Sequence, residues 1–255
     1  MPWLYFIFVI SGFSALLYQV VWQRTLFAIY GINVESVTVI VTAFMLGLGL
    51  GSLAGGHASK DVRRPALLLF SIVELTIGAY GAVSVSLFRW IGSLTLGHGA
   101  LATFCLSFAL VLLPTMLMGA TLPILVAHAV RVTRSVGRSV GLLYFVNTLG
   151  SALASGAAAF LLLGNLGQRG TVHLAASLNV AVSGIAYLRY RLEHRRSRDQ
   201  VPASDQRIIP EGDGVTRRGN RAVEEEGGAR ADAQGFGDVV VGEDDRHAGL
   251  GKVRQ

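Results

Sequence analysis

The chain has 255 residues, of which 52% are apolar and only 15% are charged, and its formal net charge is +6. This composition argues against an ordinary soluble domain, because several apolar runs reach the roughly 20 residues needed to cross a bilayer of about 30 Å. The basic excess belongs to the apolar part: residues 1–200 hold fourteen Lys and Arg against five Asp and Glu, whereas residues 201–255 hold eight against eleven. Basic residues so placed set membrane topology, so the lipid bilayer is the expected partner and nucleic acid is not.

The pattern predicts an all-α fold, a polytopic membrane helix bundle of six transmembrane helices followed by a disordered tail. The first span has no basic residue before it and no small-residue cleavage pattern after it, so we interpret it as a retained span and not a signal peptide. A connector over 22–36 carries Arg24 and Glu35. The membrane domain covers 1–190, with spans at about 3–21, 37–56, 66–88, 100–122, 140–163 and 171–188.

The second span ends in a short basic loop. Gly47, Gly51 and Gly55 recur every four residues and therefore share one helix face. Such a face lets a neighbouring helix come close, which is how helices pack where lipid removes the hydrophobic driving force. The loop that follows carries Lys60, Arg63 and Arg64. Together these features predict a membrane hairpin with its turn in the cytoplasm.

The fourth span contains Pro114 and Gly119 and is followed by Pro123. Because proline removes a backbone hydrogen bond, we expect a kink or a broken end there. The next loop, at 127–139, carries three arginines: Arg131, Arg134 and Arg138. A turn at 164–170 then leads from the fifth span to the sixth.

The basic residues are divided unequally between the loops. If both termini are cytoplasmic, the inside loops carry eleven, including five arginines after the sixth span, and the outside loops carry three, Arg24, Arg89 and Arg169. This positive-inside bias predicts a multi-pass protein of the cell inner (plasma) membrane with cytoplasmic N- and C-termini. Arg24 alone conflicts, because it follows a first span that has no basic residue before it.

Residues 191–255 form a basic juxtamembrane segment and a cytoplasmic tail. Residues 201–255 are rich in Gly, Arg, Asp and Glu and contain one aromatic residue, Phe236. Such a segment buries too little apolar surface to offset its chain entropy, so we expect disorder. An authentic tail, a truncation and a frameshift product all remain open.

Five stretches carry a resemblance to a known group: SGFSALLYQVVWQR (11–24), AFMLGLGLGSLAGG (43–56), VELTIGAYG (73–81), LPTMLMGATLPIL (113–125) and LLYFVNTLGSALASGAAAFLLLGNLG (142–167). Together they resemble the membrane half of the spermidine synthase-like integral membrane proteins. That group joins a membrane domain, distantly similar to half of a major facilitator transporter, to a soluble aminopropyltransferase-like domain. The loop GGHASKDVRRP also resembles the loop between the second and third helices of facilitators, although His57 and the order Lys60–Asp61 depart from the usual pattern.

This resemblance implies a membrane module that anchors or serves polyamine metabolism, with a soluble synthase domain as a partner. The group suggests aminopropyl transfer, but no catalytic residue is identified here, so whether the chain is an enzyme stays open. A synthase domain needs a strand, a glycine-rich turn and acidic residues, and the tail offers only Gly235-Phe236-Gly237. No cofactor and no metal site is expected. Two alternatives are a half-size facilitator-like transporter acting as a homodimer and a structural or assembly membrane protein.

A candidate intramembrane polar site comprises Glu74, Asn147, Tyr18 and Gln19. Ionisable groups at membrane depth usually face a protein interior, a cavity or a partner. Glu74 is therefore either a proton or amine site or a structural carboxyl bonded to a neighbouring helix. Asn147 suits interhelical hydrogen bonding or substrate contact. Tyr18 and Gln19 are candidates to line a pathway with Glu74, and Tyr18 also suits interfacial anchoring.

Overall fold

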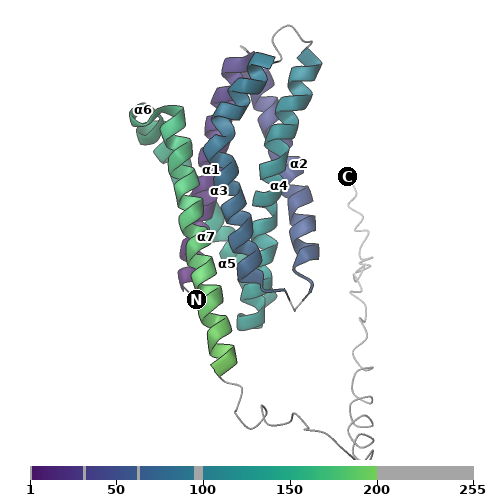
Figure 1. Cartoon of the computed structure of the whole chain (residues 1–255), viewed down its shortest axis with the longest axis vertical. Helices are drawn as coiled ribbons and strands as arrows, with labels where there is room; N and C mark the ends of the chain where they lie inside the picture. The colour runs from purple at the N-terminus through teal and green to yellow at the C-terminus, as the bar shows by residue number, and fades with distance from the viewer. Residues whose placement is uncertain (1, 31–32, 62–63, 95–99, 200–255) are drawn as a thin grey trace, which may run out of the picture. The chain divides into compact units, whose positions relative to one another are not determined.

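The computed structural model describes residues 2–30, 33–61, 64–94 and 100–199, and these residues fold almost entirely as helices, with no strand among them. The elements are α1 (Pro2–Tyr30), α2 (Asn33–Ala58), α3 (Ala66–Leu94), α4 (Ala100–Thr133), α5 (Val136–Ala157), the π-helical turn η1 (Ala158–Leu162), α6 (Leu163–Asn165) and α7 (Gly167–Asp199). The long helices run side by side as a bundle, with α6 at the turn between α5 and α7 (Figure 1). The predicted tail, 201–255, and the loop residue Arg63 lie outside the described residues.

Five helical stretches in the described part of the chain are long and apolar enough to cross a membrane. They are Pro2–Ile29, Val37–Ala58, Ala66–Leu94, Phe104–Thr133 and Val136–Arg196. The fold is therefore the predicted all-α membrane bundle, although this count is five where we predicted six spans. The fifth stretch is 61 residues long and contains a turn at Gly167, whose φ of 64° is a left-handed conformation that glycine adopts without steric penalty.

The helices are longer than the predicted spans, and the predicted connectors are correspondingly shorter. The connector expected at 22–36 is largely helical, because Trp22 and Leu26 are fully buried and extend the packed face of α1. The loop expected at 127–139 reduces to Arg134 and Ser135 between α4 and α5. The length of an apolar run predicts which part of a helix lies in lipid. Side-chain packing outside the lipid decides where the helix ends.

The predicted break in the fourth span does not occur, since α4 continues through Pro114 and Pro123. Pro114 has no N–H to donate to the carbonyl of Leu110, four residues earlier. The hydroxyl of Tyr80 on α3 donates to that carbonyl instead, at 2.7 Å. A neighbouring helix thus supplies the missing donor, which is how membrane helices tolerate proline.

Helices α2 and α4 pack with their backbones in close contact. A Cβ added at Gly51 would overlap the carbonyl oxygen of Met116, and one added at Gly47 would overlap the side chain of Thr115. At Gly55 an added Cβ would come within 2.7 Å of the Ala120 backbone. The structure therefore places the three glycines predicted to mediate helix packing along the contact with α4.

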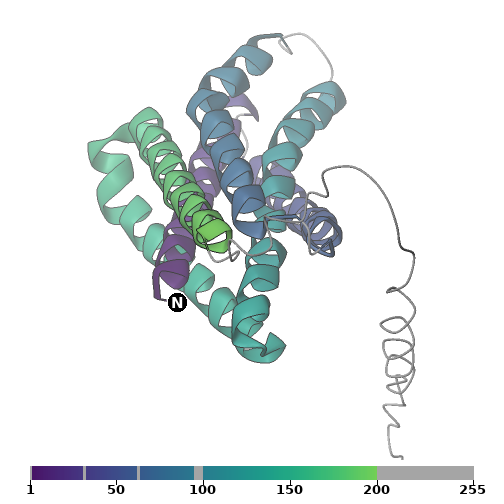
Figure 2. The same ribbon diagram turned by 60° about the horizontal axis from the view of Figure 1, so that its bottom comes forward.

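Two further helix pairs are held by polar groups and small residues. Between α1 and α5, the Ser151 hydroxyl donates to the Gly12 carbonyl at 3.1 Å. Between α3 and α7, the hydroxyls of Ser71 and Ser183 each donate to the other residue's carbonyl, at 2.9 and 2.8 Å. Viewed toward its lower end, the bundle shows α1 lying between α5 and α7 (Figure 2). The bundle is thus built from three close pairs, α2 with α4, α1 with α5 and α3 with α7.

Candidate functional site

Glu74 is fully buried on α3 and is bonded from two other helices. The Ser11 hydroxyl on α1 donates to Oε1 at 2.5 Å, and the Asn179 amide nitrogen on α7 donates to Oε2 at 2.8 Å. Both carboxylate oxygens therefore meet uncharged donors. The cluster of Glu74, Ser11 and Asn179, called here the carboxyl cluster, joins α1, α3 and α7 inside the bundle.

Two buried polar atoms in this part of the bundle have no hydrogen-bond partner: the Asn179 carbonyl oxygen Oδ1 in the cluster and the Tyr18 hydroxyl on α1. Tyr18 lies on the same face of α1 as Ser11, two helical turns further along. Its ring packs on Gly81 of α3, where an added Cβ would overlap it. The site therefore holds unused hydrogen-bonding capacity in a region closed to solvent.

The structure brings together only part of the predicted polar site. Tyr18 is completely buried against Gly81 of α3, on the same face of α1 as Ser11, so it is not an interfacial anchor. Asn147 lies elsewhere, on α5 against Gly12 of α1, and Gln19 is half-buried on α1. Sequence reasoning missed Ser11 and Asn179, although an amide within an apolar span is the kind of signal that had drawn attention to Asn147.

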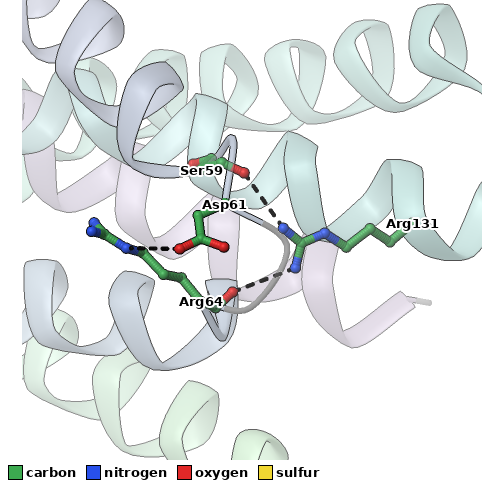
Figure 3. A network of polar contacts seen from close by, with 4 residues as sticks. All are labelled: Ser59, Asp61, Arg64 and Arg131. Atoms are coloured by element: carbon green, nitrogen blue, oxygen red, sulfur yellow. Dashed lines mark hydrogen bonds and ion pairs between the residues drawn. The ribbon is translucent and has the colours of Figure 1, made fainter.

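Arg131, near the end of α4, reaches the backbone of the loop after α2 (Figure 3). The Arg131 guanidinium donates to the Ser59 carbonyl at 3.4 Å and to the Arg64 carbonyl at 3.5 Å. Arg64 also forms an ion pair with Asp61 at 3.6 Å. These contacts are exposed and contribute less than about 1 kcal/mol each, but they place the α2–α3 loop and the α4–α5 turn at one end of the bundle.

The start of α1 and the end of α7 lie at the same end of the bundle as these contacts. The ring of Trp3, near the start of α1, lies 6.4 Å from the ring of His128 on α4. The Arg189 guanidinium, near the end of α7, lies 5.0 Å above the Trp3 ring. The basic residues predicted to be cytoplasmic therefore gather at one end, called here the basic end: Lys60, Arg64, Arg131, Arg134, Arg138, Arg189, Arg191, Arg195 and Arg196.

The opposite end holds a cavity of about 320 Å³ between α1, α3 and the start of α7. Its polar lining comes from Thr25, Arg89, Ser93 and Gln168. We call this cavity the Arg89 pocket. The Thr25 hydroxyl, which is buried, lies 3.4 Å from the Gln168 side-chain oxygen. Arg89, one of the three basic residues predicted to lie outside, is thus at the other end from the basic cluster.

Comparison with protein-family models matches residues 4–238 to the Major Facilitator Superfamily. The chain belongs to this superfamily. The facilitator part of the resemblance drawn from the sequence is therefore correct, and its spermidine synthase-like part has no support in these comparisons. No curated protein and no solved structure matches the chain.

Membership in the facilitator superfamily indicates where a substrate path lies relative to such a bundle. Facilitators are built from two halves of six helices, and the substrate passes between the halves. The carboxyl cluster of this facilitator lies within one bundle, between α1, α3 and α7. The cluster therefore joins three helices of one bundle, and its full burial keeps it from direct contact with a solute outside the bundle.

Proposed function

We propose that this facilitator is a half-size transporter, in which two copies of the six-span bundle pair to enclose a solute pathway. The single observation that carries the proposal is the family match over residues 4–238. In this superfamily the pathway runs between two bundles, and the proposal assigns the second bundle to a second copy of this chain.

The sixth span follows from the long stretch Val136–Arg196. Crossing a bilayer takes about 20 residues, and this stretch has 61. It turns at Gly167, and its two arms have different partners, α5 packing on α1 and α7 on α3. We infer that α5 and α7 are separate spans, so that the chain crosses the membrane six times.

Two exposed stripes suit the pairing of copies. On α2, small or polar residues recur at helical spacing and face away from the bundle: Thr38, Thr42, Gly49, Ser52 and Gly56. On α5 a similar stripe comprises Gly137, Gly141, Thr148, Ala152 and Ser155. Added Cβ atoms at Gly49, Gly56, Gly137 and Gly141 would meet nothing within 4 Å. Small and hydroxyl-bearing residues let membrane helices approach closely, so these stripes are the surfaces proposed to contact the second copy.

Cross-linking tests the pairing. In a Cys105→Ser background, we expect Ser52→Cys and Thr148→Cys to yield cross-linked dimers in native membranes, because both positions lie on the stripes. Val83→Cys, on the exposed face of α3, is the control and should remain monomeric. Cross-linking at position 83 together with none at positions 52 and 148 would contradict the proposed interface.

Transport itself is tested in proteoliposomes. Polyamines are the first solutes to try, because the resemblance drawn from the sequence concerned polyamine metabolism, and labelled spermidine is the probe. We expect uptake to fall when Gly49→Trp blocks the α2 stripe. An added Cβ at Gly49 would meet nothing within 4 Å, so we expect the single bundle to stay folded. Uptake that is unchanged by Gly49→Trp would argue against a pathway formed between copies.

The proposed orientation places the basic end and both termini of the chain in the cytoplasm of the inner membrane. Cysteines introduced at Lys60 and Arg134 should react with an impermeant reagent from the same side, and one at Arg89 from the opposite side. The expectation follows from the positive-inside bias and from the contacts of Arg131 with the α2–α3 loop. Reaction of positions 60 and 134 from opposite sides would contradict the six-span topology.

A further inference from the structure

We propose that each bundle carries a binding site for one phospholipid with an anionic headgroup, in a groove between α3 and α7. Arg89 and Arg169 hold the headgroup phosphate, and the groove beside them holds an acyl chain. The groove and both arginines belong to a single bundle, so this site does not depend on the pairing of copies or on transport.

The groove, called here the α3–α7 groove, is an open apolar cavity of about 360 Å³. At its floor the two backbones come close, since a Cβ added at Gly78 would lie 3.1 Å from the Ala176 carbonyl oxygen. Small side chains line most of it, among them Ala79, Ala82 and Ser177. Unfilled space forfeits dispersion contacts, so a groove of this kind in a bilayer favours a flexible hydrocarbon chain that fills it.

Two exposed arginines lie beyond the groove, toward the outer end, meaning the end of the bundle opposite the basic end. On α3, Ala82 and Arg89 are two helical turns apart and share one face. On α7, Arg169 and Ala176 have the same spacing. The sequence contains no Asp or Glu from Ala82 to the end of α3, or from the start of α7 to Ala176. An anion at the outer end of the groove therefore meets two positive charges and no carboxylate on the helices that form it.

The depth of these arginines in a bilayer suits a headgroup. A hydrocarbon core of about 30 Å takes about 20 helical residues. Counted from Ala66, which directly follows the basic loop, the core ends within one helical turn of Arg89, and counted back from Arg189 it ends at Arg169. Both arginines therefore lie at the outer edge of the hydrocarbon, and the α3–α7 groove lies within its outer half.

His173 supplies a polar contact between the arginines and the apolar part of the groove. It lines the groove one helical turn below Arg169, and its side chain is exposed. Its carbonyl accepts from the Ser177 hydroxyl, but among the described residues its ring has no hydrogen-bond partner. A polar group without a partner is costly in hydrocarbon. The ester oxygens of a phospholipid lie directly below its phosphate, so a lipid held by Arg169 brings an acceptor to the His173 ring.

A second copy of the chain suits this face less well than a lipid does. A twofold contact brings the same surface of each copy together. Arg89 and Arg169 of one copy would then lie near the same two residues of the other, with no carboxylate on the groove helices to separate them. An anionic lipid neutralises these charges instead.

Native mass spectrometry of the intact, delipidated protein tests the site. The probes are phosphatidylglycerol, which is anionic, and phosphatidylcholine, which is zwitterionic. We expect one tightly bound phosphatidylglycerol per chain, and Arg89→Gln and Arg169→Gln should each weaken its binding by about fivefold, the effect of one arginine beside an anionic lipid. Arg24→Gln is the matched control, because Arg24 is an exposed arginine of the same end that lines neither the groove nor the Arg89 pocket. An equal loss in all three variants, or equal binding of the two lipids, overturns the proposal.

The seating of the acyl chain has its own test. Ala82→Phe fills the groove and should weaken phosphatidylglycerol binding by about tenfold, as expected when roughly two buried methylene groups are displaced. Val83→Phe is the matched control, since it places the same ring at the next residue, which is exposed and outside the groove. Ala79→Leu is the second variant if Ala82→Phe fails to fold, because Ala79 is also exposed in the groove. Binding that is the same in the groove variants and in Val83→Phe overturns the proposal.

Two further measurements separate the lipid from other occupants of the groove. Inorganic phosphate should not displace the bound lipid, since it has no chain to fill the groove, and displacement by phosphate alone overturns the proposal. In a Cys105→Ser background, Ala82→Cys should not form cross-linked dimers in native membranes. A dimer cross-linked at position 82 places a second copy in the groove and overturns the lipid site.

Discussion

Replacing Gly51 with Leu is expected to destabilise the bundle by about 3 kcal/mol or more, the upper range for overpacking a close-packed contact. A Cβ at this position would already overlap the Met116 carbonyl oxygen on α4. Backbone cannot move aside as a side chain does, so α2 and α4 must separate. The temperature at which the detergent-solubilised protein loses its monodisperse chromatographic peak should fall sharply.

Gly49→Leu is the matched control for this prediction. Gly49 lies two residues away on the same helix, and an added Cβ would meet nothing within 4 Å. The two substitutions have the same effect on helix propensity and hydropathy. Because Gly49 also lies on the stripe proposed to pair copies, the two variants are compared as monomers, where a difference between them reports the contact with α4. Equal thermal stability of the two variants would show that α2 and α4 do not pack as described.

Replacing Glu74 with Leu is expected to destabilise the bundle by about 2 kcal/mol, because it leaves the buried Ser11 hydroxyl and Asn179 amide without an acceptor. An orphaned buried donor costs about 1–3 kcal/mol in soluble proteins, whereas hydrogen bonds between membrane helices average about 0.6 kcal/mol. Glu74→Gln keeps an acceptor oxygen and should lose much less. Unfolding of both variants by titration with a denaturing detergent measures the difference.

A double-mutant cycle separates the bonds from the change in side-chain shape. Asn179→Leu alone should also destabilise the bundle, and the double variant Glu74→Leu with Asn179→Leu should be more stable than the sum of the two losses predicts. Strict additivity would mean that the bond between Glu74 and Asn179 contributes nothing to stability.

These two positions also distinguish a transporter from a purely structural module. Gly51→Leu should impair either kind of protein, since both need a folded bundle. Glu74→Gln should leave assembly nearly intact, because it keeps an acceptor oxygen, so a loss of transport in this variant would report a role of the carboxyl beyond joining helices. Normal assembly with no effect of position 74 on any transport readout would favour the structural alternative.

Local pattern predicted apolar helices long enough to cross a membrane, but it did not predict where these helices end. The spacing of Gly47, Gly51 and Gly55 indicated a close contact, because residues four apart share a helix face whatever the partner. Proline in the fourth span indicated a break that is absent, because the donor that compensates for Pro114 belongs to Tyr80 on another helix, thirty residues before the Leu110 carbonyl that it meets. Such compensation cannot be read from the segment that contains the proline.

By itself, the sequence determined that this protein is a bundle of membrane helices with its basic residues segregated between loops. Apolar length and charge act locally on each segment, so they need no knowledge of neighbours. Only the tertiary structure decided that α2 pairs with α4, α1 with α5 and α3 with α7, and that Glu74 meets Ser11 and Asn179. Those partners lie 63 and 105 residues away in the chain. In lipid, where every helix face is apolar, it is close packing and a few buried hydrogen bonds that choose among helices, and both depend on three-dimensional contact.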